Sequence, residues 1–314
     1  MPRILVHTPG FLTTIQDLGR PGFAHLGVSA SGAADALSLR LGNLLVGNPE
    51  TAAGLEMTLI GGVFEFESET LVAVTGSDFE PRLNGASVPL WTSFAVRGGD
   101  RLEFGPTKSG ARCYLCIRGG VDCPPVLGSA STHLLTSLGG LEGRALKKGD
   151  VIQIHRGSPQ HSALLRMKPE VLDALFQATP LRVTRGPQAD WFSRETHALL
   201  SSSPYTVSEN SNRMGLRLIG PELKRTIDRE LLTEGVSLGA VQVPQGGQPI
   251  ILFVEHQTTG GYPKIANVIL ADMHRVGQLR PRDEVRFEFI SMDMALNLFQ
   301  QQELLVNPQS LVPA

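Results

Sequence analysis

Gly99-Asp100-Arg101-Leu102-Glu103-Phe104 is the stretch that best indicates the fold, because it joins a turn to a strand. The pattern recurs as Gly149-Asp150-Val151-Ile152-Gln153-Ile154, and as Arg282-Asp283-Glu284-Val285-Arg286-Phe287, where Arg replaces the glycine. In each copy an Asp that can bond nearby backbone N–H groups opens a strand whose alternate residues are apolar. We interpret the pattern as a general turn-into-strand device, which predicts antiparallel β structure in both halves of the chain.

Short apolar segments dominate the rest of the sequence, and Gly, Pro, Asn or Asp residues bound them, as is typical of β-strands. Between two such segments, Asn84-Gly85 predicts a two-residue hairpin turn, since both residues accept a positive φ. The clearest predicted strands are Val63–Phe66, Leu71–Thr75, Arg112–Arg118, Ile250–Val254 and Val285–Phe289.

Helices are expected to be few. The strongest candidate is Ser31–Val46, where leucines recur at helical spacing. Ser31 is its expected N-cap, and Gly47, Asn48 and Pro49 end it. Weaker helical patterns cover Pro169–Gln177, Pro187–Leu200 and Met292–Leu304.

The predicted architecture is mostly β, with two barrel-like units and a few peripheral helices, because closing each sheet removes its exposed edges. A doubly wound α/β sheet is the weaker alternative, since the long helices that it needs between strands are missing. His155–Lys168 is polar and lacks periodicity, so we expect it to link two domains, at 1–165 and 166–314.

Composition excludes several classes of protein. The 314 residues carry a net charge of -2, which argues against binding to nucleic acid. Aromatic residues make up only 6% of the chain, so a stacking platform for bases is not expected. No stretch approaches the ~18 apolar residues of a membrane helix, and the first apolar run is too short for a signal peptide. We therefore expect a cytoplasmic protein without membrane contact.

Cys113 and Cys116 have the C-x-x-C spacing of some metal sites, but the segment around them is a predicted strand. Residues three apart on a strand point to opposite faces, so one metal ion cannot take both thiolates. We interpret them as buried thiols of a strand and assign no metal site to the chain.

Two polar, glycine-rich stretches depart from the strand pattern. The first contains Gln16, Asp17 and Arg20, which together can orient a small polar or anionic substrate. The alternative is an internal pair between Asp17 and Arg20 that holds the loop. Ser31-Gly32-Ala33-Ala34-Asp35 follows this stretch along the chain.

The second stretch is Gln257-Thr258-Thr259-Gly260-Gly261-Tyr262-Pro263-Lys264. Its hydroxyls, flexible backbone N–H groups and lysine suit a phosphate or a carboxylate, with the anion at Gly260-Gly261 beside Lys264. The alternative is a hairpin turn that happens to be polar. The adjacent His256 is more typical of a packed residue than of a base.

Taken together, these stretches resemble the family of the 5-oxoprolinase C subunit, also called KipA-like or allophanate hydrolase subunit 2-like and described as biotin-dependent carboxyltransferases. The resemblance runs nearly end to end. It rests on Thr14–Arg20, Ser31–Asp35, Asn43–Asn48, Gly119–Asp122, Leu127–Thr132, Arg185–Gln188, Asn212–Leu218, Gln242–Pro244 and Gln257–Lys264.

The resemblance implies two cyclophilin-like β-barrel domains and a set of substrate-binding residues. That set adds Ser31, Asp35 and Arg213, from the matching segments, to the residues of the two polar stretches. The sequence departs from the family at three places, one of which is Pro281-Arg282-Asp283 in place of the usual Pro-Gly-Asp. Asn212 replaces the usual Asp, and Glu255-His256 replaces the usual Asp-Arg, so identical substrate contacts are not expected.

The function that the resemblance implies is the C subunit of an ATP-dependent 5-oxoprolinase, which is a hydrolase acting on a cyclic amide. Its partners would be the KipI-like B subunit and the A subunit of the same enzyme. The sequence contains no phosphate-binding loop and no evident nucleophile, so ATP is expected at the level of the complex and the chain alone is expected to be inactive.

Two alternatives remain. One is the carboxyltransferase component of a urea carboxylase or allophanate-type system. Biotin would be carried by another chain, because this chain lacks the Met-Lys-Met context of a biotin carrier, and Met167-Lys168 is followed by Pro169. The other is a KipA-like regulatory module that binds a KipI-like inhibitor of a sensor kinase.

Overall fold

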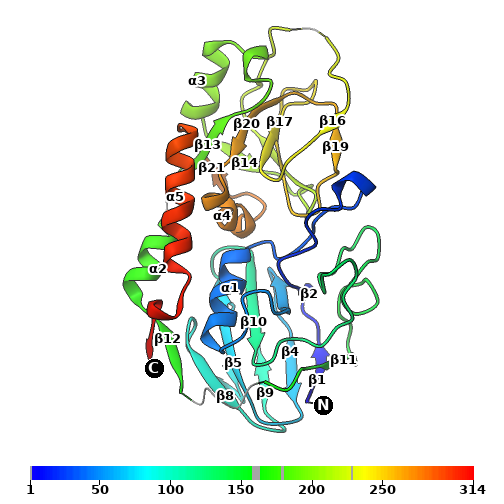
Figure 1. The fold of residues 1–314 in the computed structure, drawn as a ribbon, viewed down its shortest axis with the longest axis vertical. Helices are drawn as coiled ribbons and strands as arrows, with labels where there is room; N and C mark the ends of the chain where they lie inside the picture. The colour runs from blue at the N-terminus through cyan, green and yellow to red at the C-terminus, as the bar shows by residue number, and fades with distance from the viewer. Residues whose placement is uncertain (1, 158–162, 178–179, 228) are drawn as a thin grey trace. The chain divides into compact units, whose positions relative to one another are not determined.

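The computed structural model describes residues 2–157, 163–177, 180–227 and 229–314 (Figure 1). Among the described residues, 32% are in strands and 19% in helices, so the chain is mostly β, as predicted. It forms two compact units that alternate along the sequence. Unit 1 comprises residues 1–20, 31–175 and 305–314, and unit 2 comprises residues 21–30 and 176–304. None of the described helices is long and apolar enough to cross a membrane.

Two sheets form the body of unit 1. Their strand orders are β11-β1-β4-β9-β6-β7 and β2-β3-β10-β5-β8, and a separate ladder pairs β12 with β23. The strands are β1 (Arg3–Thr8), β2 (Leu12–Gln16), β3 (Gly54–Thr58), β4 (Val63–Phe66), β5 (Thr70–Gly76), β6 (Arg82–Leu83), β7 (Ala86–Ser87), β8 (Ser93–Val96), β9 (Arg101–Glu103), β10 (Arg112–Ile117), β11 (Val151–Gln153), β12 (Leu165–Met167) and β23 (Leu311–Pro313). The helices are α1 (Ala36–Leu45), α2 (Pro169–Leu175) and the 3-10 turn η4 (Pro308–Ser310).

The core of unit 1 lies between its two sheets. Ile4 of β1 and Phe64 of β4 come from one sheet, and Leu55 of β3 and Val74 of β5 come from the other. All four side chains are at most 1% exposed. Because strand residues alternate between faces, each strand supplies every second residue to this core.

Helix α1 covers the opposite face of the second sheet, against β5 and β10 (Figure 1). Cys113 belongs to the core between the sheets, whereas the Cys116 thiol lies under α1, 3.6 Å from the carbonyl oxygen of Leu39. The predicted placement of the two thiols on opposite faces is therefore confirmed. Burial raises the pKa of both thiols well above the usual range.

The start of α1 was predicted one turn too early. Ser31 has a left-handed backbone (φ 54°), and its hydroxyl donates to the Thr132 carbonyl at 3.0 Å. Asp35 is the N-cap instead, since its carboxylate accepts the Ser38 backbone N–H at 2.9 Å and the Ser38 hydroxyl at 2.6 Å.

The three turn-into-strand copies share one hydrogen bond. Asp100, Asp150 and Asp283 each accept the backbone N–H of the residue three positions earlier, at 2.7–2.8 Å. The hairpin turn at Asn84-Gly85 is also present, because it joins β6 to β7 with both residues at positive φ.

Unit 2 contains one eight-stranded sheet in the order β21-β14-β15-β18-β17-β20-β13-β22, and a small ladder of β16 with β19. The strands are β13 (Leu181–Arg185), β14 (Tyr205–Val207), β15 (Gly215–Ile219), β16 (Glu234–Gly235), β17 (Ala240–Gln242), β18 (Ile250–Leu252), β19 (Thr259–Gly260), β20 (Lys264–Val268), β21 (Glu284–Val285) and β22 (Phe287–Phe289). The helices are α3 (Arg194–Ser202), α4 (Met273–Gln278) and α5 (Met292–Leu305), with 3-10 turns η1 (Ala24–Leu26), η2 (Ala189–Trp191) and η3 (Leu270–Asp272).

The large sheet of unit 2 is nearly closed into a barrel. Its two edge strands, β21 and β22, are consecutive along the chain, and Arg286 alone separates them. The predicted strand Val285–Phe289 is therefore split between the two edges that meet. Such closure leaves few unpaired backbone groups.

Other expected boundaries shift by a few residues. The helix predicted over Pro187–Leu200 is η2 followed by α3, because the Ser193 hydroxyl caps a new helix at the Thr196 N–H. Within the predicted linker, 158–162 lie outside the described residues and Leu165–Met167 form β12. The division into domains 1–165 and 166–314 stays a prediction, since compact units defined by contacts need not be domains that fold alone.

Candidate functional site

Asp17 is the centre of the first cluster of predicted site residues. It follows β2 and is 8% exposed. Its carboxylate accepts four hydrogen bonds, from the Gly19 N–H (2.8 Å), the Ala130 N–H (2.7 Å) and the hydroxyls of Ser129 (2.6 Å) and Ser131 (2.5 Å). Both oxygens are therefore engaged, and Asp17 fixes the segment 129–131 beside β2.

Arg20 binds the same segment. Its Nε donates to the Val126 carbonyl at 3.2 Å, and its guanidinium also donates to the Ser131 carbonyl. The side chain is 1% exposed. Asp17 and Arg20 thus both hold residues 126–131, and a role of either in orienting a substrate stays a prediction.

Gln16 is the third member of this cluster and is completely buried. Its amide nitrogen donates to the Thr14 hydroxyl and to the Thr132 carbonyl, both at 3.0 Å. Its carbonyl oxygen Oε1 has no hydrogen-bond donor among the described residues. A buried acceptor without a donor costs free energy, so this oxygen is suited to accept an N–H from a ligand.

Ser31 and Asp35 have structural partners in unit 1, as their contacts with Thr132 and Ser38 show. Asp35 also belongs to a buried network that sequence reasoning missed. The Glu56 carboxylate accepts the Ala34 N–H and the Tyr114 hydroxyl, each at 2.7 Å, and the Tyr114 oxygen accepts the Asp35 N–H at 2.7 Å. Burial, and then the charge of Glu56, raises the pKa of Tyr114 well above its usual value.

The second cluster of predicted residues lies in unit 2. Arg213 Nε donates to Glu255 Oε1 at 2.5 Å, and the two side chains are 7% and 2% exposed. His256 Nδ1 donates to the Gln257 carbonyl at 2.7 Å, and burial lowers the pKa of its ring. The side-chain oxygen Oδ1 of Asn212 accepts the Met214 backbone N–H at 2.8 Å, which is a turn contact.

The stretch from Gln257 to Lys264 contains a short paired strand. Thr259 and Gly260 form β19, which pairs with β16, and the Thr258 carbonyl accepts the Val236 N–H at 3.1 Å. Gly261 and Tyr262 are exposed, Tyr262 by 50%.

Lys264 and Gln257 each contact a residue that sequence reasoning did not select. Lys264 Nζ donates to the Glu234 carboxylate, and Gln257 Nε2 donates to Gln242 Oε1 at 3.4 Å. Gln188 also belongs to this group, because its side-chain oxygen accepts the backbone N–H of Lys264 at 3.1 Å. Gln188 and Gln242 lie in segments that resemble the family, so the resemblance could have identified them as site residues. No sequence motif contains Glu234.

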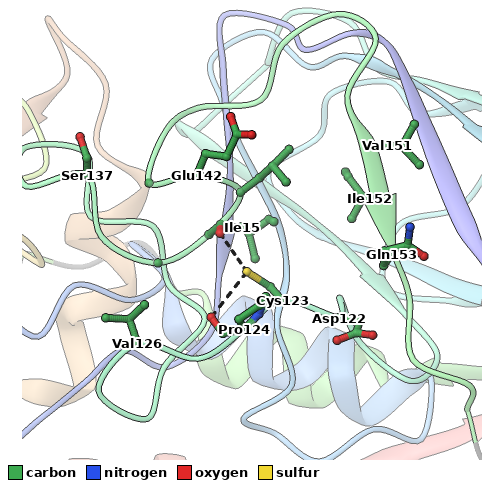
Figure 2. A pocket seen from close by; sticks show the side chains of 14 residues that line it. Ile15, Asp122, Cys123, Pro124, Val126, Ser137, Glu142, Val151, Ile152 and Gln153 are labelled. Atoms are coloured by element: carbon green, nitrogen blue, oxygen red, sulfur yellow. Dashed lines mark hydrogen bonds between the residues drawn. The ribbon is translucent and has the colours of Figure 1, made fainter.

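A cavity of about 450 Å³ lies in unit 1, beside the segment that Asp17 and Arg20 hold (Figure 2). Ile15, Val126 and Ile152 contribute apolar walls, and the Cys123 thiol donates to the Gly140 carbonyl at 2.9 Å. Its charged lining side chains are carboxylates, those of Asp122 and Glu142. Glu142 pairs with Arg144 at 2.9 Å, so the charge of this lining carboxylate is compensated within the chain.

These features define a mostly β protein with two compact units, each of which holds predicted site residues among its buried polar side chains. Residues 26–289 match the family model described as carboxyltransferase domain, subdomain A and B. The chain belongs to that family.

Relatives of known name agree with the family. The chain is 43% identical to the C subunit of 5-oxoprolinase from Escherichia coli over 94% of its length and 93% of that protein. It is 38% identical to the C subunit of 5-oxoprolinase from Haemophilus influenzae over 93% of its length and 92% of the relative. The crystal structure of K. lactis urea amidolyase matches 97% of the chain with a TM-score of 0.89 and 33% identity. The chain spans only 20% of that larger protein.

Proposed function

We propose that this chain is the C subunit of an ATP-dependent 5-oxoprolinase, which converts 5-oxoproline and ATP to glutamate. The observation that carries the proposal is the 43% identity to a protein of that name over 94% of this chain. The fold supports it as well, since the family match covers both compact units.

The chemistry of the first cluster suits this substrate class. A five-membered lactam presents one N–H donor, and Gln16 Oε1 is a buried acceptor without a donor among the described residues. Asp17 and Arg20 fix the segment around Gln16, and we propose that turnover by the complex depends on this cluster.

The ring opening needs an energy source, because a five-membered lactam is stable and little strained. ATP is expected to supply it at the level of the complex, with the KipI-like B subunit and the A subunit as partners in the cytoplasm. The sequence contains no phosphate-binding loop, so we assign no nucleotide site to this chain.

A second candidate function is the carboxyltransferase component of a urea carboxylase. The likeness to urea amidolyase, with a TM-score of 0.89, favours it. Biotin would then come from another chain. The regulatory alternative, binding of a KipI-like kinase inhibitor, needs neither biotin nor turnover.

ATP hydrolysis by the complex co-purified with this chain separates the three functions. Hydrolysis that requires 5-oxoproline supports the proposal, and a requirement for biotin and urea supports the carboxyltransferase. Absence of both, with retained binding to a KipI-like protein, supports the regulatory module. Robust 5-oxoproline-dependent turnover by the isolated chain would contradict the expectation that it acts only in a complex.

A further inference from the structure

In unit 2, an exposed carboxylate caps a buried ammonium group. Glu234 Oε1 accepts hydrogen bonds from Lys264 Nζ and, at 2.9 Å, from Gln188 Nε2. The Glu234 side chain is 41% exposed, whereas that of Lys264 is 3% exposed. A buried ammonium must have an anionic partner, but an exposed carboxylate is readily solvated when it leaves.

A buried donor without an acceptor lies next to this ion pair. Gln242 is 1% exposed, and its Nε2 has no hydrogen-bond partner among the described residues. Its Oε1 is already occupied by Gln257 Nε2 at 3.4 Å. Gln242 on β17 is paired in register with Lys264 on β20, directly after an irregularity of the ladder between Val241 and Gln242.

The short ladder of β16 and β19 connects these groups to the surface. In this ladder Glu234 is the register partner of Gly260. Gly260 packs on the same amide, because a Cβ there would lie 2.8 Å from Gln242 Nε2. The ladder has two residues in each strand, which makes it a small element to open.

Glu234 satisfies this group of donors incompletely. Its carboxylate engages Lys264 and Gln188 but leaves Gln242 Nε2 without an acceptor among the residues that the structure describes. A carboxylate that enters from solvent has two oxygens, one for the ammonium and one for the amide. Such a ligand would make the bond to Lys264 that Glu234 makes and also the bond to Gln242 that Glu234 lacks.

We propose that Glu234 is an internal stand-in for the carboxylate of a small ligand, which displaces it from Lys264 and also accepts a hydrogen bond from Gln242. This inference rests on the proposed function for the identity of the ligand, since 5-oxoproline carries one carboxylate. Competition by Glu234 lowers the apparent affinity of the site for the ligand.

Thermal unfolding of the full-length chain tests the proposal. In Glu234→Gln the buried ammonium loses its anion, so the melting temperature should fall. Acetate or 5-oxoproline should restore it by roughly 2–4 °C at about ten times the dissociation constant, relative to chloride at equal ionic strength. Wild type should need at least about tenfold more of either carboxylate for the same rise.

The matched control is Glu230→Gln, which removes the same charge from an exposed side chain four residues away. It should respond to carboxylates as wild type does. If Glu234→Gln does not fold, Glu234→Asp is tested in its place, because Asp has a shorter side chain. Carboxylates should raise the melting temperature of Glu234→Asp too, but by less. In the Glu234→Gln background, Lys264→Gln should abolish the carboxylate effect and Gln242→Leu should weaken it.

The outcomes separate this proposal from the proposed function. Equal carboxylate responses of wild type and Glu234→Gln would overturn it, even where the complex hydrolyses ATP with 5-oxoproline. A response of Glu234→Gln to acetate but not to 5-oxoproline would support the stand-in role and count against 5-oxoproline as substrate. A response that persists in the Lys264→Gln double variant would also overturn it.

Discussion

Arg213 Nε lies 2.5 Å from Glu255 Oε1, and the two side chains are 7% and 2% exposed within unit 2. Glu255 directly follows the buried residues Phe253 and Val254, and Arg213 lies just before β15. The pair therefore ties the segment before β15 to the segment after β18. Because each charge is the other's partner, removal of one leaves the other buried beside apolar residues.

Arg213→Leu should destabilise the chain by about 3–5 kcal/mol, the usual cost of breaking a buried ion pair from one side. Chemical denaturation followed by circular dichroism measures this change. The double variant Arg213→Leu, Glu255→Leu should recover much of the loss, since no unpaired charge remains. Arg217→Leu, on the exposed face of β15, is the control and should cost less than about 0.5 kcal/mol. Equal losses in the single and double variants would contradict this account.

Arg282→Gly should stabilise the chain by about 1 kcal/mol, because Arg282 holds a left-handed φ of 75°. The other copies of this turn have Gly99 at φ 89° and Gly149 at φ 88°. The ion pair lost with Arg282 joins side chains that are 84% and 65% exposed, so it contributes little.

The reciprocal change, Gly149→Arg, should destabilise by a similar amount, although a Cβ there meets nothing within 4 Å. Thermal unfolding of both variants tests whether Arg282→Gly raises and Gly149→Arg lowers the melting temperature. A loss of stability in Arg282→Gly would show that the pair with Glu209 outweighs the backbone conformation.

Asp150 should stabilise the chain above about pH 4 and lose this contribution as the pH falls. Hydrogen bonds from Arg144, and then from the Lys147 backbone, hold the pKa of its carboxyl below the usual value. Since the pKa is lower in the folded state, the unfolded chain takes up the proton first as the pH falls through the unfolded value near ~3.9. The unfolding free energy then decreases as the pH falls further, until the pH reaches the lower pKa of the folded state.

The difference in unfolding free energy between wild type and Asp150→Asn should therefore be about 1 kcal/mol at pH 7 and shrink towards pH 3. A difference that stays constant between pH 7 and pH 3 would exclude the ionised Asp150 as its cause.

Local signals were enough to predict much of the fold. Asn84-Gly85 specifies its own turn through positive φ, and the faces of Cys113 and Cys116 follow from strand geometry alone. Where two signals competed, the prediction failed. Ser31 and Asp35 are both good N-caps, and contact of Ser31 with Thr132, 101 residues away, decides between them.

The partners of the site residues were much harder to predict than the residues. The stretch Gln257–Lys264 stands out by its composition, but Glu234 lies 30 residues from Lys264 in a segment without a motif. Asp17 likewise finds its partners at Ala130 and the two serines beside it, more than 110 residues away. Sheet register brings such pairs together, and no local pattern encodes it.

Gln16→Leu should raise the KM of the assembled complex for 5-oxoproline by about tenfold, because it replaces the buried amide of the first cluster by an apolar side chain. The hydrogen bonds from the amide nitrogen to Thr14 and Thr132 are lost too, so the unfolding free energy should also decrease. Gln16→Glu keeps an acceptor and should restore part of the affinity. An unchanged KM in Gln16→Leu would remove Gln16 from the substrate site.

Gly261→Val should abolish activity of the assembled complex while the isolated chain still folds. Gly261 is exposed, and a Cβ there would contact the Leu231 carbonyl oxygen at 3.3 Å, so a larger side chain changes the surface of the loop more than the core. Gly246→Val is the matched control, since a Cβ at this exposed turn meets nothing within 4 Å and activity should be retained.

Two measurements on Gly261→Val distinguish ligand binding from docking of a partner. Pull-down of the KipI-like protein with the variant reports association, and ATP hydrolysis by the complex reports turnover. Lost turnover with retained association places a ligand at the loop, because side chains there block close approach of the backbone N–H groups. Lost association makes the loop a docking surface for the KipI-like protein. Wild-type values in both measurements, for Gly261→Val and for Lys264→Gln, would mean that the loop has neither role.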